Sequence, residues 1–371
     1  MSNLKNPVYI TDIATAVPRK SYSQDLARRF ITRLPRYTEE QKTFLNRVYE
    51  GTAIEKRHTV VEDYDKEPSE YEFYAQNAEL EPEPGLEQRN DLFIQHARSL
   101  SIEAVRTLLD SRPGLDPHSI THLITVSCTG FSAPGFDFDI MQQIPLSSSL
   151  HRFHLGFMGC YAAFPAMKLA HSICTADPAA RVLIVNVELC SLHLQLKAET
   201  DIMVANALFA DGVTATLMSG EAGLTKGRNA LALHGYASRV IDNSVGDMAW
   251  KIGSTAFDMR LSVYVPKFIQ KNIGTVVDDL LLQVGHTRDD VQTWAIHPGG
   301  RAILDRTAKA LELEDGALDN SFAVLREYGN MSSATIFFVL KRILEQGNAG
   351  LIFAAAFGPG LTVESAILEA V

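Results

Sequence analysis

The chain has 371 residues, enough for one large domain or two of medium size. Hydrophobic residues make up 46% of it and charged residues 21%, the balance of a globular protein with ample apolar material for a core. The formal net charge of -10 excludes a broad nucleic-acid interface, because phosphate binding needs clustered Lys and Arg. A local group of cations can still bind a small anionic ligand.

The N-terminal stretch MSNLKNPVYITDIATAVP lacks the charged-then-apolar layout of a signal peptide. No apolar run reaches the roughly 18 residues that a bilayer-spanning helix needs. The cysteines show no CxxC or CxxH spacing, so we expect no structural zinc site. We therefore expect a cytoplasmic protein that does not span a membrane, in which cysteines are buried or reactive thiols.

Short β-rich apolar runs alternate with helical stretches along the chain, the pattern of an α/β protein. In chain order the predicted strands are residues 8–14, 122–127, 181–187, 214–218, 293–296 and 351–355. The predicted helices are residues 95–109, 161–175, 265–284, 301–311 and 333–345. Residues 62–89 are dense in Glu, Asp and Pro and predict a solvated excursion that contributes nothing to the core.

Cys160 is the candidate nucleophile. It follows Gly159, which permits a sharp turn, and precedes a predicted helix rich in small residues. A thiol at a helix N-terminus feels the positive end of the dipole, which favours the thiolate. A single cysteine is more often a small buried hydrophobe, and from the residues alone we expect that role for Cys128, Cys174 and Cys190.

His297 and Asn330 supply the partners that such a thiol needs. His297 ends a predicted buried strand, and Pro298 prevents the strand from continuing, so the imidazole is aimed into the fold. Asn330 stands before the serine pair that opens an apolar helix, where asparagine is also a good N-cap. Either residue alone is more often structural. Together, Cys, His and Asn form a set that can generate a thiolate and stabilise developing negative charge.

Four segments in this order make the sequence recognisable: GFMGCYAA, WAIHPGGRAILD, EYGNMSSAT and FGPGLTVESAIL. With ALFADGVTATLMSG and VPKFIQKNI, they resemble the type III polyketide synthases, the chalcone synthase-like family. The resemblance runs from residue 120 to the C-terminus and includes the N-terminal strand. It implies an α/β thiolase fold of five αβαβα layers with two pseudo-repeated halves, which we place at residues 1–225 and 226–371. It also implies a homodimer.

The resemblance also assigns the chemistry. It implies that Cys160 carries the acyl group at the end of a CoA-pantetheine tunnel, while His297 and Asn330 bind the thioester carbonyl. His297 would also hold Cys160 as a thiolate ion pair. The implied substrates are an acyl-CoA starter and malonyl-CoA, with no metal and no separate cofactor. Their decarboxylative condensation would give a pyrone, a resorcinol or a related cyclised polyketide.

Several residues are predicted to line the acyl pocket, and three of them depart from plant members of the family. Met259 stands where chalcone-forming enzymes have Phe. The stretch TVSCTGFSAPG resembles the family loop that reaches across the dimer, but it carries Cys128 and Ala133 where plant enzymes often have Thr and Met. The stretches ELCSLHLQ and MAWKIGSTAFDM look more like bacterial members, which often accept aliphatic starters. We therefore expect a linear fatty acyl-CoA starter. The predicted pocket residues are Cys128, Thr129, Ala133, Met259, Phe357, Gly358 and Pro359.

CoA phosphates need cations at the tunnel mouth. The run EKRH offers Lys56 and Arg57, with His58 beside them, and we predict that Lys56 and Arg57 bind CoA. A surface charge cluster of this kind is usually only solvated, so the prediction depends on where the fold places these side chains.

Three other functions compete with this assignment. A ketoacyl-acyl-carrier-protein synthase III uses the same three residue types for a single condensation. A thiolase proper needs a second catalytic cysteine near the C-terminus, and no cysteine lies beyond Cys190. A catalytically inactive thiolase-fold binding protein is the alternative from another class. The presence of Cys160, His297 and Asn330 together argues against it.

Overall fold

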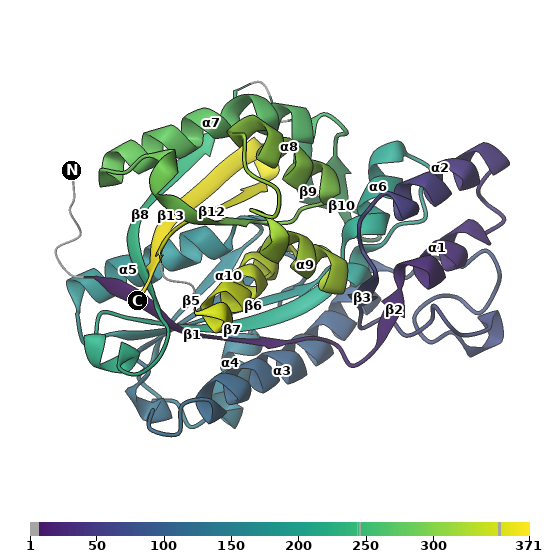
Figure 1. Ribbon diagram of the computed structural model, residues 1–371. Helices are drawn as coiled ribbons and strands as arrows, with labels where there is room; N and C mark the ends of the chain where they lie inside the picture. The colour runs from purple at the N-terminus through teal and green to yellow at the C-terminus, as the bar shows by residue number, and fades with distance from the viewer. Residues whose placement is uncertain (1–6, 243, 245, 348–349) are drawn as a thin grey trace.

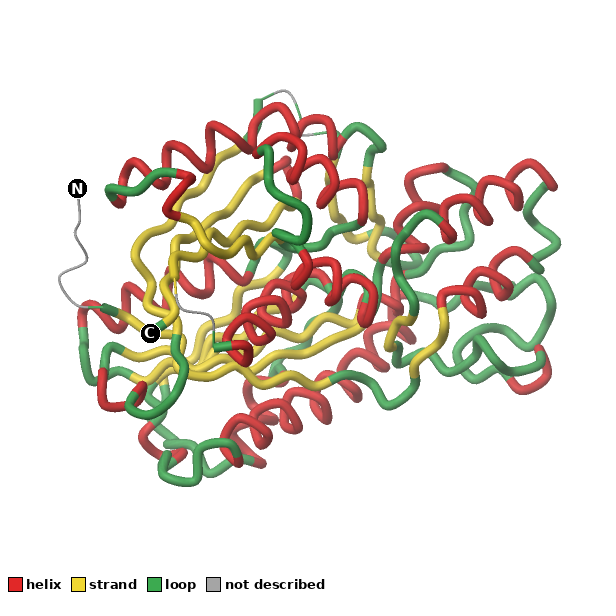
Figure 2. The backbone as a smooth tube through the Cα atoms, viewed as in Figure 1, coloured by secondary structure: helices red, strands yellow, loops and turns green. Residues whose placement is uncertain are grey.

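The computed structural model describes residues 7–242, 244, 246–347 and 350–371. Residues 1–6, part of the N-terminal stretch on which the expected cytoplasmic location rests, lie outside the described residues. Within the described ranges, nine strands form one mixed sheet in the order β11-β12-β13-β8-β1-β7-β6-β4-β5. Figure 1 and Figure 2 show helices on both outer faces of this curved sheet and between its two arms.

The first half of the sheet and its helices come from the N-terminal part of the chain. In order they are β1 (Val8–Ala16), α3 (Leu86–Asp110), β4 (His122–Ser127), α4 (Phe136–Gln143), β5 (His151–Gly156), α5 (Ala163–Ala176), β6 (Arg181–Leu189) and β7 (Asp211–Ser219). The second half comprises β8 (Leu231–Val240), α7 (Val265–Val284), β11 (Val291–Ile296), α8 (Arg301–Leu311), α9 (Asp319–Tyr328), α10 (Thr335–Gln346), β12 (Gly350–Gly358) and β13 (Thr362–Ala370).

The two halves repeat one topology. In the first, β1 pairs antiparallel with β7, β7 antiparallel with β6, and β6 parallel with β4. In the second, β8 pairs antiparallel with β13, β13 antiparallel with β12, and β12 parallel with β11. A short antiparallel ladder between Val8–Ile10 of β1 and Leu231–Leu233 of β8 joins them. The pseudo-repeat implied by the sequence is confirmed, while the exact division at residue 225 stays a prediction.

Five layers follow from where the helices pack. α5 and α10 lie between the two arms of the sheet, α3 covers the outer face of the first arm, and α7 covers that of the second (Figure 1). A helix between two sheets has no solvent face, which explains why α10 is buried all round from Thr335 to Leu340. In α5, Ala163, Ala166 and Ala170 are buried and allow the close approach that a central layer needs.

A lobe beside the main body contains elements that the sequence did not predict. They are β2 (Ser21–Ser23), α1 (Gln24–Thr32), α2 (Glu39–Glu50), β3 (Lys56–His58) and α6 (Thr200–Leu208), with the hairpin of β9 (Met248–Ile252) and β10 (Phe257–Leu261) nearby. Every predicted strand and helix is present, and residues 122–127, 265–284 and 301–311 keep their predicted bounds. None of the helices in the described ranges has the length and apolarity needed to cross a bilayer.

The prediction that residues 62–89 are solvated and outside the core is wrong. Tyr71, Phe73, Tyr74 and Leu80 are buried and pack with Phe30 of α1 in one of the main core clusters. One of the acidic residues that suggested solvation, Asp63, is itself buried. The buried carboxylate of Asp63 accepts backbone N–H bonds from Glu72, Phe73 and Tyr74 at 2.8–3.0 Å, which folds the segment back on itself.

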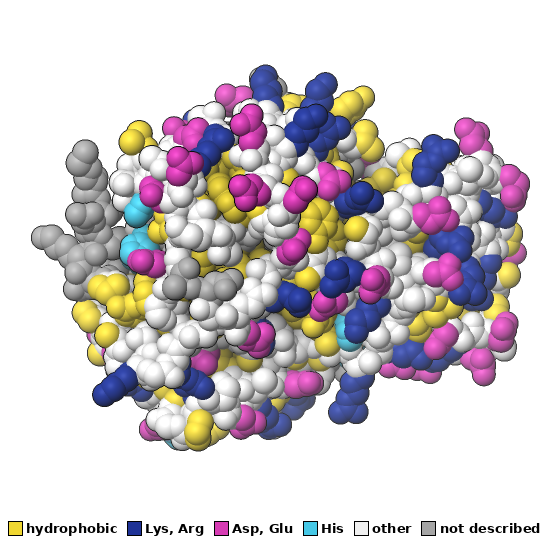
Figure 3. Space-filling view, viewed as in Figure 1, with side chains coloured by type: hydrophobic (Ala, Val, Ile, Leu, Met, Phe, Trp, Pro, Cys, Tyr) yellow, Lys and Arg dark blue, Asp and Glu magenta, His cyan; other side chains and the backbone are white. Residues whose placement is uncertain are grey.

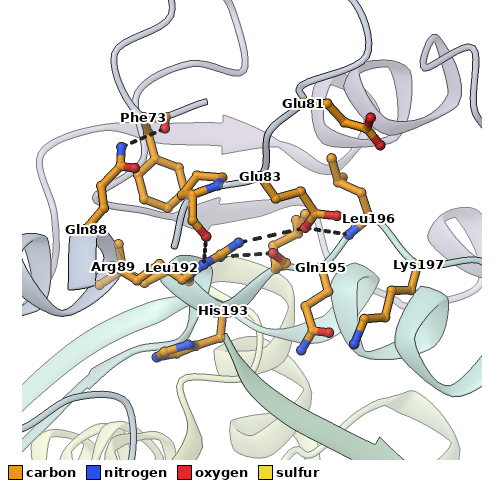
Figure 4. A network of polar contacts seen from close by, with 12 residues as sticks. Phe73, Glu81, Glu83, Gln88, Arg89, Leu192, His193, Gln195, Leu196 and Lys197 are labelled. Atoms are coloured by element: carbon orange, nitrogen blue, oxygen red, sulfur yellow. Dashed lines mark hydrogen bonds and ion pairs between the residues drawn. The ribbon is translucent and has the colours of Figure 1, made fainter. Parts of the chain in front are cut away.

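Arg89 ties this segment to the body of the protein. Its fully buried guanidinium donates to the carbonyls of Pro84, Leu192 and Leu194, and Glu83 accepts from the Leu196 N–H at 3.3 Å (Figure 4). The excursion therefore supports residues 192–196, which form part of the cavity wall described below.

Candidate active site

Cys160 lies in the tight connection between β5 and α5. Gly159 has φ +80°, and a Cβ at this position would overlap the ring of Pro359. Glycine is therefore required here, both for the left-handed turn and for the close approach of the C-terminal loop. Cys160 is buried, with 8% of its surface exposed. The helix begins at Ala163, so the thiol lies just before its first turn.

His297 follows directly on β11. Its backbone N–H donates to Ala355 of β12 at 2.8 Å, and Gly299 and Gly300, with φ +155° at Gly300, then lead the chain into α8. The side chain is 1% exposed. Among the described residues neither ring nitrogen has a hydrogen-bond partner. A buried polar group without a partner is costly, so this imidazole is available for a group that the free protein does not contain.

Asn330 is fixed by its backbone as well as by its side chain. Its N–H donates to Leu208 at 2.9 Å and its carbonyl accepts from Ala210 at 2.8 Å, a parallel bridge centred on Phe209. The side-chain oxygen accepts from the Ser332 N–H at 2.9 Å, two residues ahead, but Asn330 is not the N-cap of α10, whose N-cap is Ala334. The amide nitrogen donates one N–H to the Gly299 carbonyl at 3.3 Å. Its second N–H is left for a group in the cavity that Asn330 lines.

These three side chains line one cavity, although they come from three distant segments. Cys128, Thr129, Met259, Phe357 and Pro359 line it too, as predicted. Ala133 does not: it is exposed on the loop after β4. Gly358 is not among the lining residues either, and its missing side chain leaves room for the ring of Tyr161. Neither residue lines the cavity formed by a single chain, and the prediction that Ala133, on a loop expected to reach across a dimer, contributes to a pocket is not tested by one chain.

The cavity wall also contains residues that the motifs did not single out, Phe209, Cys190 and Ser332 among them. Two others join the β9–β10 hairpin to the loop after β4. Trp250 donates its indole N–H to the Cys128 carbonyl at 2.6 Å. His193 bridges the Thr129 carbonyl at 2.7 Å and the Phe257 N–H at 3.1 Å, stacked 4.2 Å from the Phe257 ring. The stretches ELCSLHLQ and MAWKIGSTAFDM already contained both residues, but only the fold brings them together.

Burial sets the protonation of the two reactive groups. It raises the pKa of the Cys160 thiol to about 12, against hydrogen bonds from Ser332 and Asn330 that lower it. It lowers the pKa of His297 to about 3. Taken alone, each group favours its neutral form, and the helix following Cys160 does not reverse this. A neighbouring opposite charge would favour the charged form of either group, so the predicted ion pair between Cys160 and His297 stays a prediction.

Glu188 is a further ionisable group close to the thiols. It is fully buried, and its carboxylate accepts from the Cys128 N–H at 3.2 Å, from the Thr129 hydroxyl at 3.2 Å and from the Ser333 hydroxyl. Burial raises its pKa to about 7. The Cys128 sulfur lies 3.4 Å from the Ser332 hydroxyl, so a hydrogen-bonded path connects this carboxyl group to the cavity.

Arg57 lines the catalytic cavity but is not a surface cation, and its predicted role in binding CoA stays a prediction. Its guanidinium is buried, with donors used by Gln24, Asn206 and Phe209. Lys56 is exposed on β3. The two neighbours in sequence point in opposite directions because successive residues of a strand alternate between its faces. No group of three or more His, Cys, Asp or Glu side chains in the described ranges is arranged to hold a metal ion.

The chain resembles known proteins over its whole length. The family model for the N-terminal domain of chalcone and stilbene synthases matches residues 3–222, and that for the C-terminal domain matches residues 232–371. The curated protein "Alpha-pyrone synthesis polyketide synthase-like Pks18" of Mycobacterium tuberculosis is 29% identical over 368 residues, which cover 97% of this chain and 90% of that protein.

Solved structures of polyketide synthases resemble this chain as well. PKS-I from the brown alga Ectocarpus siliculosus superposes with a TM-score of 0.91 at 30% identity, covering 99% of both chains. The C-terminal type III polyketide synthase domain of Steely1 from Dictyostelium gives a TM-score of 0.88 at 26% identity, covering 99% of this chain and 100% of that one.

Two domain models of one family, matched in order along the chain, leave no place for the ketoacyl-acyl-carrier-protein synthase III or the inactive binding protein. The two halves of the sheet thus correspond to the N-terminal and C-terminal domains of one family. The chain belongs to the chalcone and stilbene synthase family and is a type III polyketide synthase, an acyltransferase that performs a condensation on CoA-thioester substrates.

Proposed function

We propose that the enzyme loads an acyl group on Cys160 and extends it with malonyl units, using His297 and Asn330 to hold the thioester oxygen of malonyl-CoA as it becomes an enolate oxygen. The observation that carries this proposal is the convergence of the three side chains on one cavity, where the His297 ring has no other partner. A neutral imidazole N–H and an amide N–H are donors that stabilise an oxyanion without giving up a proton.

The Cys160 thiolate attacks the starter thioester and CoA leaves as the thiol, taking the proton that Cys160 gave up. The carboxylate of malonyl-CoA is then lost as CO2, and the bonding pair becomes an enolate whose oxygen accepts from His297 and Asn330. The enolate carbon attacks the acyl carbonyl on Cys160. Collapse of that intermediate breaks the C–S bond and leaves a β-ketoacyl-CoA and the thiolate.

Mass spectrometry of products from malonyl-CoA and a panel of acyl-CoA starters tests this function directly. We expect extended polyketides without any acyl carrier protein. Failure to extend any starter, by protein that still binds malonyl-CoA, would contradict the proposal.

We further propose that the starter is a linear aliphatic acyl group and that the product is a pyrone or a related ring. The relative in Mycobacterium tuberculosis is named for α-pyrone synthesis. Met259, half-buried on β10, lines the cavity beside Leu261 and Met248, and a flexible thioether allows a linear chain to pass.

Replacing Met259 with Phe should shorten the preferred starter or reduce the number of extensions, while malonyl-CoA decarboxylation continues. Each buried CH2 is worth about 0.8 kcal/mol, so excluding several of them shifts kcat/KM between starters by orders of magnitude. Product profiles across a series of starter lengths measure the effect. Identical profiles in the variant and the wild type would mean that Met259 is only part of the core.

For CoA we propose an open cleft that adjoins the catalytic cavity. The two share Leu261, Gly299 and Ile303, and the cleft is lined further by Arg47 at the end of α2 and Arg301 at the start of α8. Its remaining lining is mostly aliphatic and suits a pantetheine arm. On the face seen in Figure 3, basic and acidic side chains are mixed, so binding of a phosphate depends on particular cations and not on a field of one sign.

Arg47→Ala or Arg301→Ala should raise the KM for malonyl-CoA about 10- to 100-fold with little change in kcat, since a hydrogen bond to a charged group is worth about 1.5–3 kcal/mol. Steady-state kinetics measure this, and malonyl-pantetheine, which lacks the phosphates of CoA, should react equally well with variant and wild type. Lys56→Ala is the matched control. A raised KM in that variant alone would restore the sequence-based CoA site.

We also propose a homodimer formed through β5. This strand is the edge of the sheet, is exposed along most of its length and presents Phe153, which is 42% exposed; Phe131, on the loop after β4, is 49% exposed. An open edge with exposed aromatic side chains favours pairing with a second strand. Ala133, exposed on the loop that carries Phe131, would then lie at the partner. Sedimentation equilibrium showing a monomer would contradict this.

A further inference from the structure

The C-terminal end of α6 is held by donors from α1 and α2, which lie in the same lobe but far away in the sequence. The last carbonyls of a helix lack partners within the helix. Here the Gln24 amide donates to Ala207 at 2.8 Å, and the Tyr49 hydroxyl donates to Asn206 at 3.3 Å. Both side chains are buried. The lobe thus fixes a helix end whose sequence neighbours, residues 208–210, lie beside the active site.

Arg57 is the centre of this arrangement. One guanidinium nitrogen donates to the carbonyls of Asn206 at 2.8 Å and of Phe209 at 2.7 Å, and Nε donates to Gln24 at 2.9 Å. The guanidinium also lies 5.7 Å from the Tyr49 ring centre. A cation at a helix C-terminus is favourable because it meets the negative end of the dipole. With 8% exposure, Arg57 is held rigidly at this end.

The segment that Arg57 holds is the one on which Asn330 rests. Asn330 pairs through its backbone with Leu208 and Ala210, the residues on either side of Phe209. Arg57 also packs directly against the residue before Asn330: a Cβ on Gly329, whose φ is +74°, would lie 3.0 Å from Arg57 Cγ. Displacement of Arg57 would therefore release both supports of the Asn330 backbone.

We infer that Arg57 is a positioning residue for Asn330, acting through the C-terminal end of α6 and the bridge at Phe209. The inference rests on the proposed role of Asn330 in holding the enolate oxygen. It gives this buried arginine a function unrelated to CoA phosphates. A misplacement of about 1 Å at a reacting group can cost about 10²-fold in rate, so the effect of losing Arg57 is measurable without loss of the fold.

The test compares two partial reactions of one variant. Arg57→Met should lower malonyl-CoA decarboxylation about 10²-fold, while acyl transfer from an acyl-CoA to Cys160, followed by intact-protein mass, stays within a few-fold of wild type. Arg57→Lys, which keeps a cation with several donors, should recover part of the decarboxylation. A variant in which both reactions fall together, or neither falls, would overturn the inference.

Arg112→Gln is the matched control. Arg112 is equally buried at 8% and also donates to backbone carbonyls, those of Thr11 and Leu224, yet it is not among the residues lining the cavity. It should lower the melting temperature without changing the ratio of the two reactions. If Arg57→Met does not fold, Gln24→Met removes the partner of Arg57 Nε and should shift the ratio in the same direction; an unchanged ratio there overturns the inference.

Asn330→Ala, assayed alongside, separates this inference from the function on which it rests. If Asn330→Ala decarboxylates at the wild-type rate, the proposed role of Asn330 is wrong and the inference falls with it. If Asn330→Ala loses decarboxylation while Arg57→Met keeps the wild-type ratio, only the positioning role of Arg57 is wrong.

Discussion

Replacing Asn330 with alanine should lower the rate of malonyl-CoA decarboxylation by about 10²–10³-fold, the usual cost of one oxyanion donor. The amide donates toward an enolate oxygen that exists only after CO2 has left, so its contribution is made in the transition state. Because its backbone is anchored on both sides of Phe209, the loss reflects the missing donor more than a moved chain. Release of CO2 from labelled malonyl-CoA measures the rate.

Cys160→Ala is the complementary variant. It should form no extended product but retain decarboxylation, since the enolate is held by His297 and Asn330 and not by sulfur. Asn320→Ala, on the exposed part of α9, controls for a general effect of losing an asparagine amide. Decarboxylation at the wild-type rate in Asn330→Ala would show that this side chain serves only to hold the local turn through the Ser332 N–H.

The second large effect concerns the Cys160 thiol. In wild type, the rate of alkylation by iodoacetamide should fall with decreasing pH, with an apparent pKa well below the ~8.5 of a free cysteine. The proposed reason is that the His297 imidazolium stabilises the thiolate. In His297→Ala no such partner is present, and burial keeps the pKa of the Cys160 thiol above its usual range. Alkylation near pH 7 should then fall by more than about 10²-fold and increase roughly tenfold per pH unit through pH 9.

The direction in which pH changes the alkylation rate follows from the ionisation of the Cys160 thiol, because only the thiolate reacts. As pH falls through the acid limb of wild type, the pair gains a proton, the thiolate becomes a thiol, and alkylation slows. The variant lacks this limb and reacts only as rising pH ionises the buried thiol. His171→Ala is the control, because His171 is also buried but is not among the residues lining the cavity. An alkylation profile that is the same in His297→Ala and wild type would exclude the ion pair.

Sequence patterns predicted the main sheet well because its strands are buried runs with few polar interruptions. β7, for example, is buried at all nine positions, and its central residues were sufficient to identify it. The edge strand β5, HRFHLG, was missed for the opposite reason: almost every residue is exposed, so it carries no apolar run. The helices α1 and α2 are short and mainly polar, and their burial depends on the lobe around them.

In the site, too, residues within sequence motifs could be predicted, whereas residues placed by contacts between distant segments could not. Cys160, His297 and Asn330 were identified because each occurs in a motif long enough to be recognised. Ser332, with φ +48°, and His193 were not, since their roles arise from contacts between segments far apart in the chain. Arg57 and Lys56 show the limit most clearly. Two adjacent cations look alike in sequence, yet the strand places one in the core and leaves the other in water.

The two repeated halves of the fold carry different parts of the proposed catalytic site. One half carries the sulfur nucleophile, and the other carries both the imidazole and the amide, while only a three-residue ladder joins their strands directly. Neither half alone contains all three of the proposed catalytic side chains. If their proposed roles hold, the site forms only where the two halves meet, and any change that shifts one half against the other alters its geometry.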